Sequence, residues 1–175
     1  MVTGAEASVV RMSRLVRANV IALIDLADDP AAMLHQLLTD FTENIAEADQ
    51  AVAQTVSSLR LLEDDLREAR ADEAEWGEKA RTALDKARSL RERGQVAEAD
   101  RCDELARVAL RRQARFERAA TILHEQVAQH AQLGDQLRLG LDRLRMKRDV
   151  LLRNADELAG RSRPAGVTQE PRART

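Results

Sequence analysis

Residues 34–66 read LHQLLTDFTENIAEADQAVAQTVSSLRLLEDDL, and apolar side chains recur in them at alternating steps of four and three positions. The same spacing continues to Leu90, and only Thr55 and Glu73 interrupt it. A repeat of about 3.5 residues, sustained far beyond three or four heptads, predicts a long helix with one apolar seam. The seam residues are Leu34, Leu38, Phe41, Ile45, Ala48, Val52, Thr55, Leu59, Leu62, Leu66, Ala69, Glu73, Trp76, Ala80, Ala83, Ala87 and Leu90.

Helix-terminating residues flank this seam on both sides. Asp29 is a good N-cap, and Pro30 suits the first helical position because its missing N–H would be unpaired there anyway. The seam stops before Gly94, a residue type that readily ends a helix. The first helix is therefore expected over residues 30–92.

A second seam of the same period follows the glycine. Two such helices joined by a short connection fold back on each other, because each covers the other's apolar stripe. We predict an all-α fold, a long antiparallel coiled-coil hairpin over residues 30–159 with arms at about 30–92 and 96–159. The second seam consists of Ala99, Cys102, Ala106, Ala109, Gln113, Phe116, Ala120, Leu123, Val127, His130, Gly134, Leu137, Leu141, Leu144, Arg148, Leu151, Ala155 and Leu158.

Folding the chain back about its central glycine gives a hypothesis for the polar seam positions. Arg148 is expected opposite Asp40. Glu73 is expected near Gln113 and Arg115. Such pairs would fix the register of the hairpin rather than add much stability.

The composition limits the class of protein. The 175 residues include 28 basic and 30 acidic side chains, which argues against a nucleic-acid binder. Only three residues are aromatic, too few to fill a compact globular core. No stretch approaches the roughly 20 apolar residues that span a bilayer, so membrane contact is expected to be peripheral.

Neither a disulfide nor a secretory signal is expected. Cys102 is the single cysteine, and arginines interrupt the apolar residues near the N-terminus. These features predict a cytoplasmic protein.

The sequence offers no catalytic constellation. It contains no phosphate-binding loop, zinc-protease motif or nucleophile elbow. The histidines, His35, His124 and His130, are scattered, and Glu63-Asp64-Asp65 is best interpreted as solvated charge. We therefore predict that the protein is not an enzyme and has no metal site or cofactor.

An N-terminal segment, residues 1–27, carries a separate amphipathic pattern at positions 6–27. Its apolar stripe is bounded by arginines, a pattern typical of a helix lying in the interface of an anionic bilayer. The alternative is a short helix that packs on the hairpin or on another subunit. The candidate membrane-binding residues are Val9, Arg11, Met12, Arg14, Val16, Arg17, Val20 and Leu23.

The C-terminal residues 160–175 lack periodicity and contain two prolines and four arginines. This composition predicts a disordered basic tail. A few exposed arginines would attract nucleic acid only unspecifically, so no specific nucleic-acid partner is expected.

Several motifs resemble the family of phage shock protein A and the vesicle-inducing protein in plastids. The first is Arg17-Ala-Asn-Val-Ile-Ala-Leu-Ile-Asp-Leu-Ala-Asp-Asp-Pro30, which resembles that family's link from an amphipathic helix into its first hairpin arm. Further matches are Trp76-Gly-Glu-Lys-Ala-Arg-Thr-Ala-Leu84, Leu105-Ala-Arg-Val-Ala-Leu110 and, more weakly, Leu144-Arg-Met-Lys-Arg-Asp-Val-Leu151. The chain resembles a short member that stops soon after the second arm.

The resemblance implies a helical hairpin related to ESCRT-III membrane-remodelling proteins, assembly into homo-oligomers and binding to stressed membranes. In some bacteria that family also restrains an AAA+ transcriptional activator through the tryptophan region. A partner site is thus implied at Trp76, Lys79, Ala80 and Leu84, the alternative being that Trp76 is a hairpin seam residue.

We therefore expect a peripheral scaffold that binds anionic lipids on the inner face of the cell membrane. It would maintain or remodel that membrane under envelope stress. The alternative function is a soluble coiled-coil regulator that binds and restrains a transcriptional activator.

Overall fold

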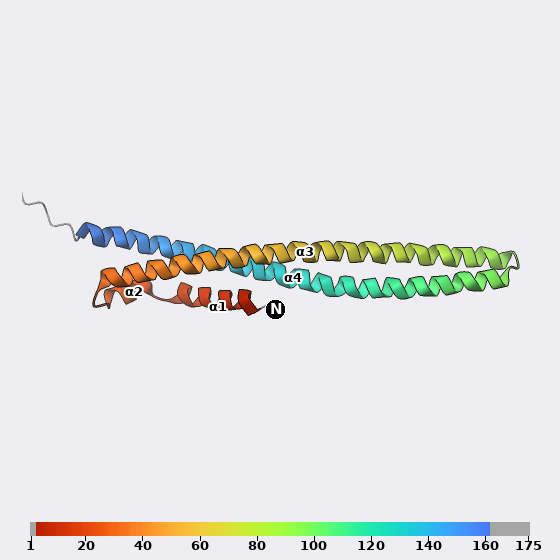
Figure 1. The fold of residues 1–175 in the computed structure, drawn as a ribbon, viewed down its shortest axis with the longest axis horizontal. Helices are drawn as coiled ribbons and strands as arrows, with labels where there is room; N and C mark the ends of the chain where they lie inside the picture. The colour runs from red at the N-terminus through yellow and green to blue at the C-terminus, as the bar shows by residue number, and fades with distance from the viewer. Residues whose placement is uncertain (1–2, 162–175) are drawn as a thin grey trace, which may run out of the picture. The chain divides into compact units, whose positions relative to one another are not determined.

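A computed structural model describes residues 3–161, and all of its regular structure is helical. The four helices are α1 (Thr3–Arg17), α2 (Val20–Asp25), α3 (Pro30–Glu92) and α4 (Val96–Arg161) (Figure 1). The predicted all-α class is confirmed, since no strand occurs among these residues. Most of the predicted C-terminal tail, residues 162–175, lies outside the described part of the chain.

The chain forms two compact units, and α3 and α4 contribute to both. The first unit combines α1, α2, the start of α3 as far as Ala53, and α4 from Asp135 onward. The second unit runs from Gln54 to Gly134 and contains the turn between the long helices. In each unit α3 and α4 pack against each other antiparallel, as the two seams predict.

The two predicted seams are the packed faces of α3 and α4. Every seam residue whose side chain is described is buried or half-buried, including Thr55 and Glu73. The units differ in what fills the seam. The bulkiest fully buried residues, Phe41, Leu137, Leu144 and Leu151, belong to the first unit. Alanines dominate the second unit's buried hydrophobic residues, which are Leu66, Ala69, Ala80, Ala87, Ala99, Cys102, Ala106, Ala109 and Ala120.

Capping residues set both ends of α3. The Asp29 carboxylate accepts a hydrogen bond from the Ala32 N–H at 3.0 Å, as expected of an N-cap. At the other end Gly94 has φ +75°, a backbone conformation that favours glycine. The N–H groups of Gly94 and Gln95 bond back to the carbonyls of Arg91 and Leu90, each at 2.9 Å, which satisfies two carbonyls of the last turn.

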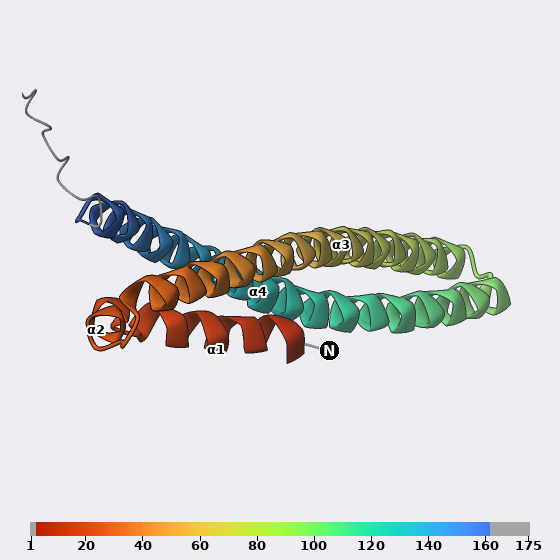
Figure 2. The ribbon, with the colours of Figure 1, turned by 60° about the vertical axis from the view of Figure 1, so that its left-hand side comes forward.

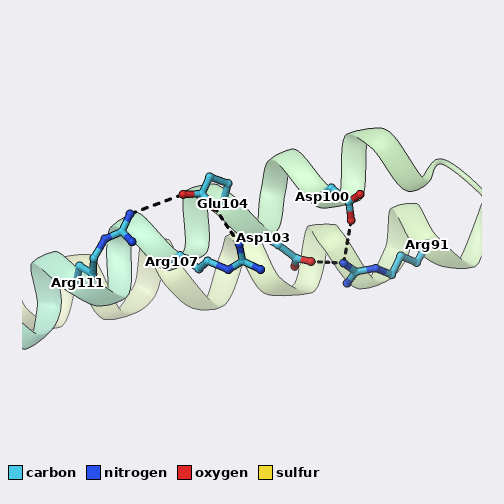
Figure 3. Close-up of polar contacts among 6 residues, drawn as sticks. All are labelled: Arg91, Asp100, Asp103, Glu104, Arg107 and Arg111. Atoms are coloured by element: carbon cyan, nitrogen blue, oxygen red, sulfur yellow. Dashed lines mark hydrogen bonds and ion pairs between the residues drawn. The ribbon is translucent and has the colours of Figure 1, made fainter.

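An ion-pair network joins the two helices beside this turn (Figure 3). The Arg91 guanidinium from α3 contacts the carboxylates of Asp100 and Asp103 on α4. The hydrogen bond and charge of Asp103 raise the pKa of Arg91 above its ordinary value. On α4, Glu104 also pairs with Arg107 and Arg111.

The cross-helix pair of the first unit differs from the predicted one. The Arg145 guanidinium donates to both oxygens of Asp49, at 2.8 and 3.0 Å. In this register Arg148 does not reach Asp40 and instead bonds to the adjacent Asp149. The predicted Arg148–Asp40 pairing is therefore wrong, because the position of the turn defines the register only to within a helical turn.

The surroundings of Glu73 also differ from the prediction. Gln113 lies against Gly77, where a Cβ on the glycine would be 3.2 Å from the amide nitrogen. Glu73 is half-buried one turn earlier, and Arg115 is exposed. Gln113 thus fills a notch opposite glycine instead of pairing with Glu73.

The N-terminal segment forms two helices instead of one continuous helix over residues 6–27. The chain leaves the helical path at Ala18 and Asn19, and the Asn19 side chain caps α2 by accepting from the Ala22 N–H at 3.3 Å. Asparagine favours such caps because its side chain competes with helical backbone bonds. α1 and α2 therefore present separate faces.

Candidate functional site

α1 runs beside α4 in the first unit (Figure 2), and its apolar side chains Val9, Met12 and Val16 lie on the side next to α4. Met12 is only 3 % exposed, and Val9 and Val16 are half-buried on either side of it. Met12 fills a notch over Gly140 of α4, where a Cβ would lie 3.1 Å from its Sδ atom. Only glycine allows the methionine to approach this closely without moving.

Polar contacts hold α1 at its C-terminal end and near its middle. Lys147 of α4 donates to the carbonyl of Ala18 at 2.7 Å and to that of Leu15 at 3.5 Å. A lysine at the C-terminal end of a helix satisfies free carbonyls and complements the negative end of the helix dipole. Arg11 pairs with Glu47 of α3 at 3.5 Å.

The other two predicted arginines point outward. Arg14 and Arg17 are exposed, and the Arg17 Nε donates to the carbonyl of Ser13 within α1. With Arg11 they place three positive charges along 15 residues of helix. Guanidinium groups at this density can pair with the phosphates of an anionic surface.

A cleft of ≈ 470 Å³ runs between α1 and α4. It is open to solvent, so α1 covers α4 only partly. The lining residues are Val9, Met12, Ser13, Val16, Arg17, Gln136, Leu139, Gly140 and Arg143.

The predicted stripe does not continue into α2. Val20 is buried, but Leu23 is 48 % exposed. Ile24 is buried in place of Leu23, the residue that the predicted stripe put on the inward side. The break at Asn19 changes the phase of the helix, which a single-helix pattern could not anticipate. Six of the eight candidate membrane-binding residues therefore share α1, and Val20 and Leu23 point in different directions on α2.

The tryptophan region of the second unit forms a groove between α3 and α4. Trp76 is half-buried, with Lys79 Nζ 4.2 Å and Arg112 Cζ 4.6 Å from its ring centre, two cation–π contacts. Leu84 is 45 % exposed, whereas Ala80 is 1 % exposed. Ala80 is a seam residue and cannot contact a partner while the helices stay packed.

Neither a metal cluster nor a membrane span occurs within residues 3–161. No three ligand-type side chains of His, Cys, Asp or Glu gather there in a way that could hold a metal ion. None of the helices in this range combines the length and hydropathy needed to cross a bilayer.

Comparison with known proteins agrees with this architecture. A sequence profile of the PspA/IM30 family matches residues 9–170, most of the chain. The chain belongs to the PspA/IM30 family. The phage shock protein A resemblance is thereby confirmed.

Relatives in this family include proteins of bacteria and plants. The membrane-associated protein Vipp1 of Synechocystis sp. is 28 % identical over 91 % of this chain and 55 % of its own length. The chloroplastic membrane-associated protein VIPP1 of Arabidopsis thaliana is 29 % identical over 89 % of this chain and 43 % of its own length. The phage shock protein A homolog of Deinococcus radiodurans is 33 % identical over 89 % of this chain and 63 % of its own length. The chain thus spans about half the length of these relatives.

The residues that hold α1 in place were not predicted from the sequence. Gly140 carries a signal, because a glycine inside a long helix costs about 1 kcal/mol relative to alanine and usually has a packing reason. Lys147 and Glu47 carry none, since charged residues at such positions normally face solvent.

Proposed function

We propose that this PspA/IM30 family member is a peripheral membrane-binding scaffold. It acts on the inner face of the cytoplasmic membrane and maintains or remodels that membrane under envelope stress. Two relatives carry the description membrane-associated, which supports this role. The observation that carries the proposal is α1, whose apolar face is bordered by Arg11, Arg14 and Arg17.

In this mechanism α1 lies in the interface of an anionic bilayer. Its arginines contact headgroup phosphates, each contributing about 1 kcal/mol near such a surface, while Val9, Met12 and Val16 enter the acyl boundary. The hairpin of α3 and α4 stays outside the membrane. Copies of the hairpin associate side by side as a homo-oligomer, which multiplies the weak binding of each α1.

The soluble-regulator alternative has less support, because two of the relatives are named as membrane-associated proteins. The groove lined by Trp76 and Lys79, together with the exposed Leu84, remains a proposed contact site for a protein partner such as an AAA+ activator. It is compatible with the scaffold role because it lies in the second unit, apart from α1 in the sequence.

Reversing the charge of α1 tests the proposal. Replacing Arg11, Arg14 and Arg17 with Glu should reduce flotation with anionic vesicles at least about tenfold, because attraction becomes repulsion. Helicity measured by circular dichroism should change little, since these residues precede α3.

A matched control carries the same change in net charge on the hairpin. Arg60, Arg70 and Arg115 are exposed and can be replaced together with Glu. This control should keep vesicle binding close to that of the unchanged chain. Equal loss of binding in both triple variants would mean that only net charge matters, and α1 would have no special role.

A further inference from the structure

We infer that α1 is held by a latch on the hairpin, and that the contacts of Met12 with Gly140 and of Lys147 with the end of α1 withhold it from membranes. This inference rests on the proposed function. Its starting point is that the face which would enter a bilayer is already occupied, since Met12 is buried against α4. One face cannot serve both surfaces at once, so membrane binding requires α1 to leave α4.

The latch is made of separate contacts with different chemistry. Met12 over Gly140 is apolar, Lys147 on the Ala18 carbonyl is a charge-assisted hydrogen bond, and Arg11 with Glu47 is an ion pair. The Lys147 contact is partly buried. Such a bond is stronger than one between neutral groups.

The surrounding chain allows α1 to be released as a unit. The helical path is interrupted at Ala18 and Asn19, and again between α2 and Pro30. α1 itself has 15 residues, a length at which an isolated helix is marginal in water. It therefore depends on either the hairpin or a bilayer for its stability.

The docked contact is also incomplete, which makes exchange between the two surfaces feasible. Val9 and Val16 are only half-buried, and the open cleft beside them leaves apolar area uncovered. A bilayer interface would cover more of that area and would gain the charges of Arg14 and Arg17. The apparent membrane affinity is then lowered by the fraction of molecules whose α1 is docked.

Two substitutions should open the latch without harming the hairpin. Gly140→Leu places a side chain where Met12 sits and also removes a helix-weakening glycine from α4. Lys147→Gln removes the charged donor at the end of α1. Lys86→Gln is the matched control, because Lys86 is exposed and has no hydrogen bond or ion pair among the described residues.

Amide hydrogen exchange of residues 7–17 measures docking in the absence of lipid. We expect exchange to be about tenfold faster in Gly140→Leu and Lys147→Gln than in the unchanged chain or in Lys86→Gln. Flotation with vesicles containing anionic phospholipid should rise in the same two variants. The rise for Lys147→Gln is informative, because loss of a positive charge alone would lower binding.

A reversible disulfide gives the decisive experiment. A Cβ at position 140 would lie 3.7 Å from the Cβ of Met12, within the range of about 3.5–4.5 Å that a disulfide spans. The full chain with Met12→Cys, Gly140→Cys and Cys102→Ala is therefore compared oxidised and reduced on the same vesicles. Oxidation should lower flotation at least about tenfold, and reduction should restore it.

The outcomes separate this inference from the proposed function. Equal flotation of the oxidised and reduced protein would overturn the latch and leave the membrane role intact. Equally fast exchange in the unchanged chain and in Gly140→Leu would also overturn it. Absence of flotation in every form, including Gly140→Leu with a freely exchanging α1, would instead overturn the membrane role and the latch with it.

Discussion

Leu151 and Leu152 are neighbours in α4 with opposite surroundings. Leu151 is fully buried in the seam, while Leu152 is 45 % exposed. Leu151→Ala should lower the free energy of unfolding by about 2–3 kcal/mol, because it removes buried methyl groups and leaves a cavity. Leu152→Ala should change it by less than about 0.5 kcal/mol. Urea denaturation followed by circular dichroism measures both, and equal losses would refute the assigned seam.

Seam positions contribute less buried apolar area in the second unit than Leu151 does in the first. Ala80, Ala87 and Ala106 occupy seam positions in the second unit and bury little apolar area each. Small residues let helices approach closely, so this packing relies on contact between backbones more than on large side chains. Enlarging one of these alanines would force the helices apart.

The turn between α3 and α4 depends on a single residue, Gly94. Because Gly94 has φ +75°, Gly94→Ala should destabilise the hairpin by about 1–2 kcal/mol, the cost of a left-handed conformation for a residue with a Cβ. Gly4 is the control, since it lies inside α1 with open space around it and Ala there should not destabilise. Urea denaturation of both variants would reveal the contrast, and equal effects would contradict the capping role of Gly94.

Long helices were predictable from the sequence because their signal repeats many times. Seventeen positions from Leu34 to Leu90 carry the first seam, so the exceptions at Thr55 and Glu73 did not obscure it. The cross-helix pairs were not predictable, because a shift of a few residues keeps both seams facing each other. The cross-helix pair therefore joins Arg145 to Asp49, whereas Arg148 bonds to its neighbour Asp149 and not to Asp40.

The position of α1 was beyond prediction for a different reason. An amphipathic helix has one apolar face, and periodicity alone does not distinguish a protein surface from a lipid surface as its partner. The sequence pattern fits both alternatives, and the structure shows the protein-packed one at Met12. A latch is compatible with both alternatives, since the apolar face of α1 would contact α4 in the docked state and the bilayer in the released state.

At the scale of the whole molecule, the chain has a net charge of −2 and so has no overall attraction for an anionic membrane. The three arginines of α1 must therefore act locally. Charges at an exposed site are screened beyond about 10 Å at 0.1 M salt and beyond about 3 Å at 1 M. Vesicle binding should weaken as salt rises, while the apolar part of binding persists.

Separating these two contributions is the last prediction. Val9→Ser and Val16→Ser together should lower the affinity for anionic vesicles about tenfold at every salt concentration, because they remove apolar burial and leave the arginines. The same valines also face α4, so their loss weakens docking as well. Since both are only half-buried there, each gains more burial in a bilayer than it loses on leaving α4, and the net effect is weaker binding. Co-sedimentation across a salt series provides the measurement. A double variant that bound as tightly as the unchanged chain would show that the apolar face of α1 does not enter the membrane.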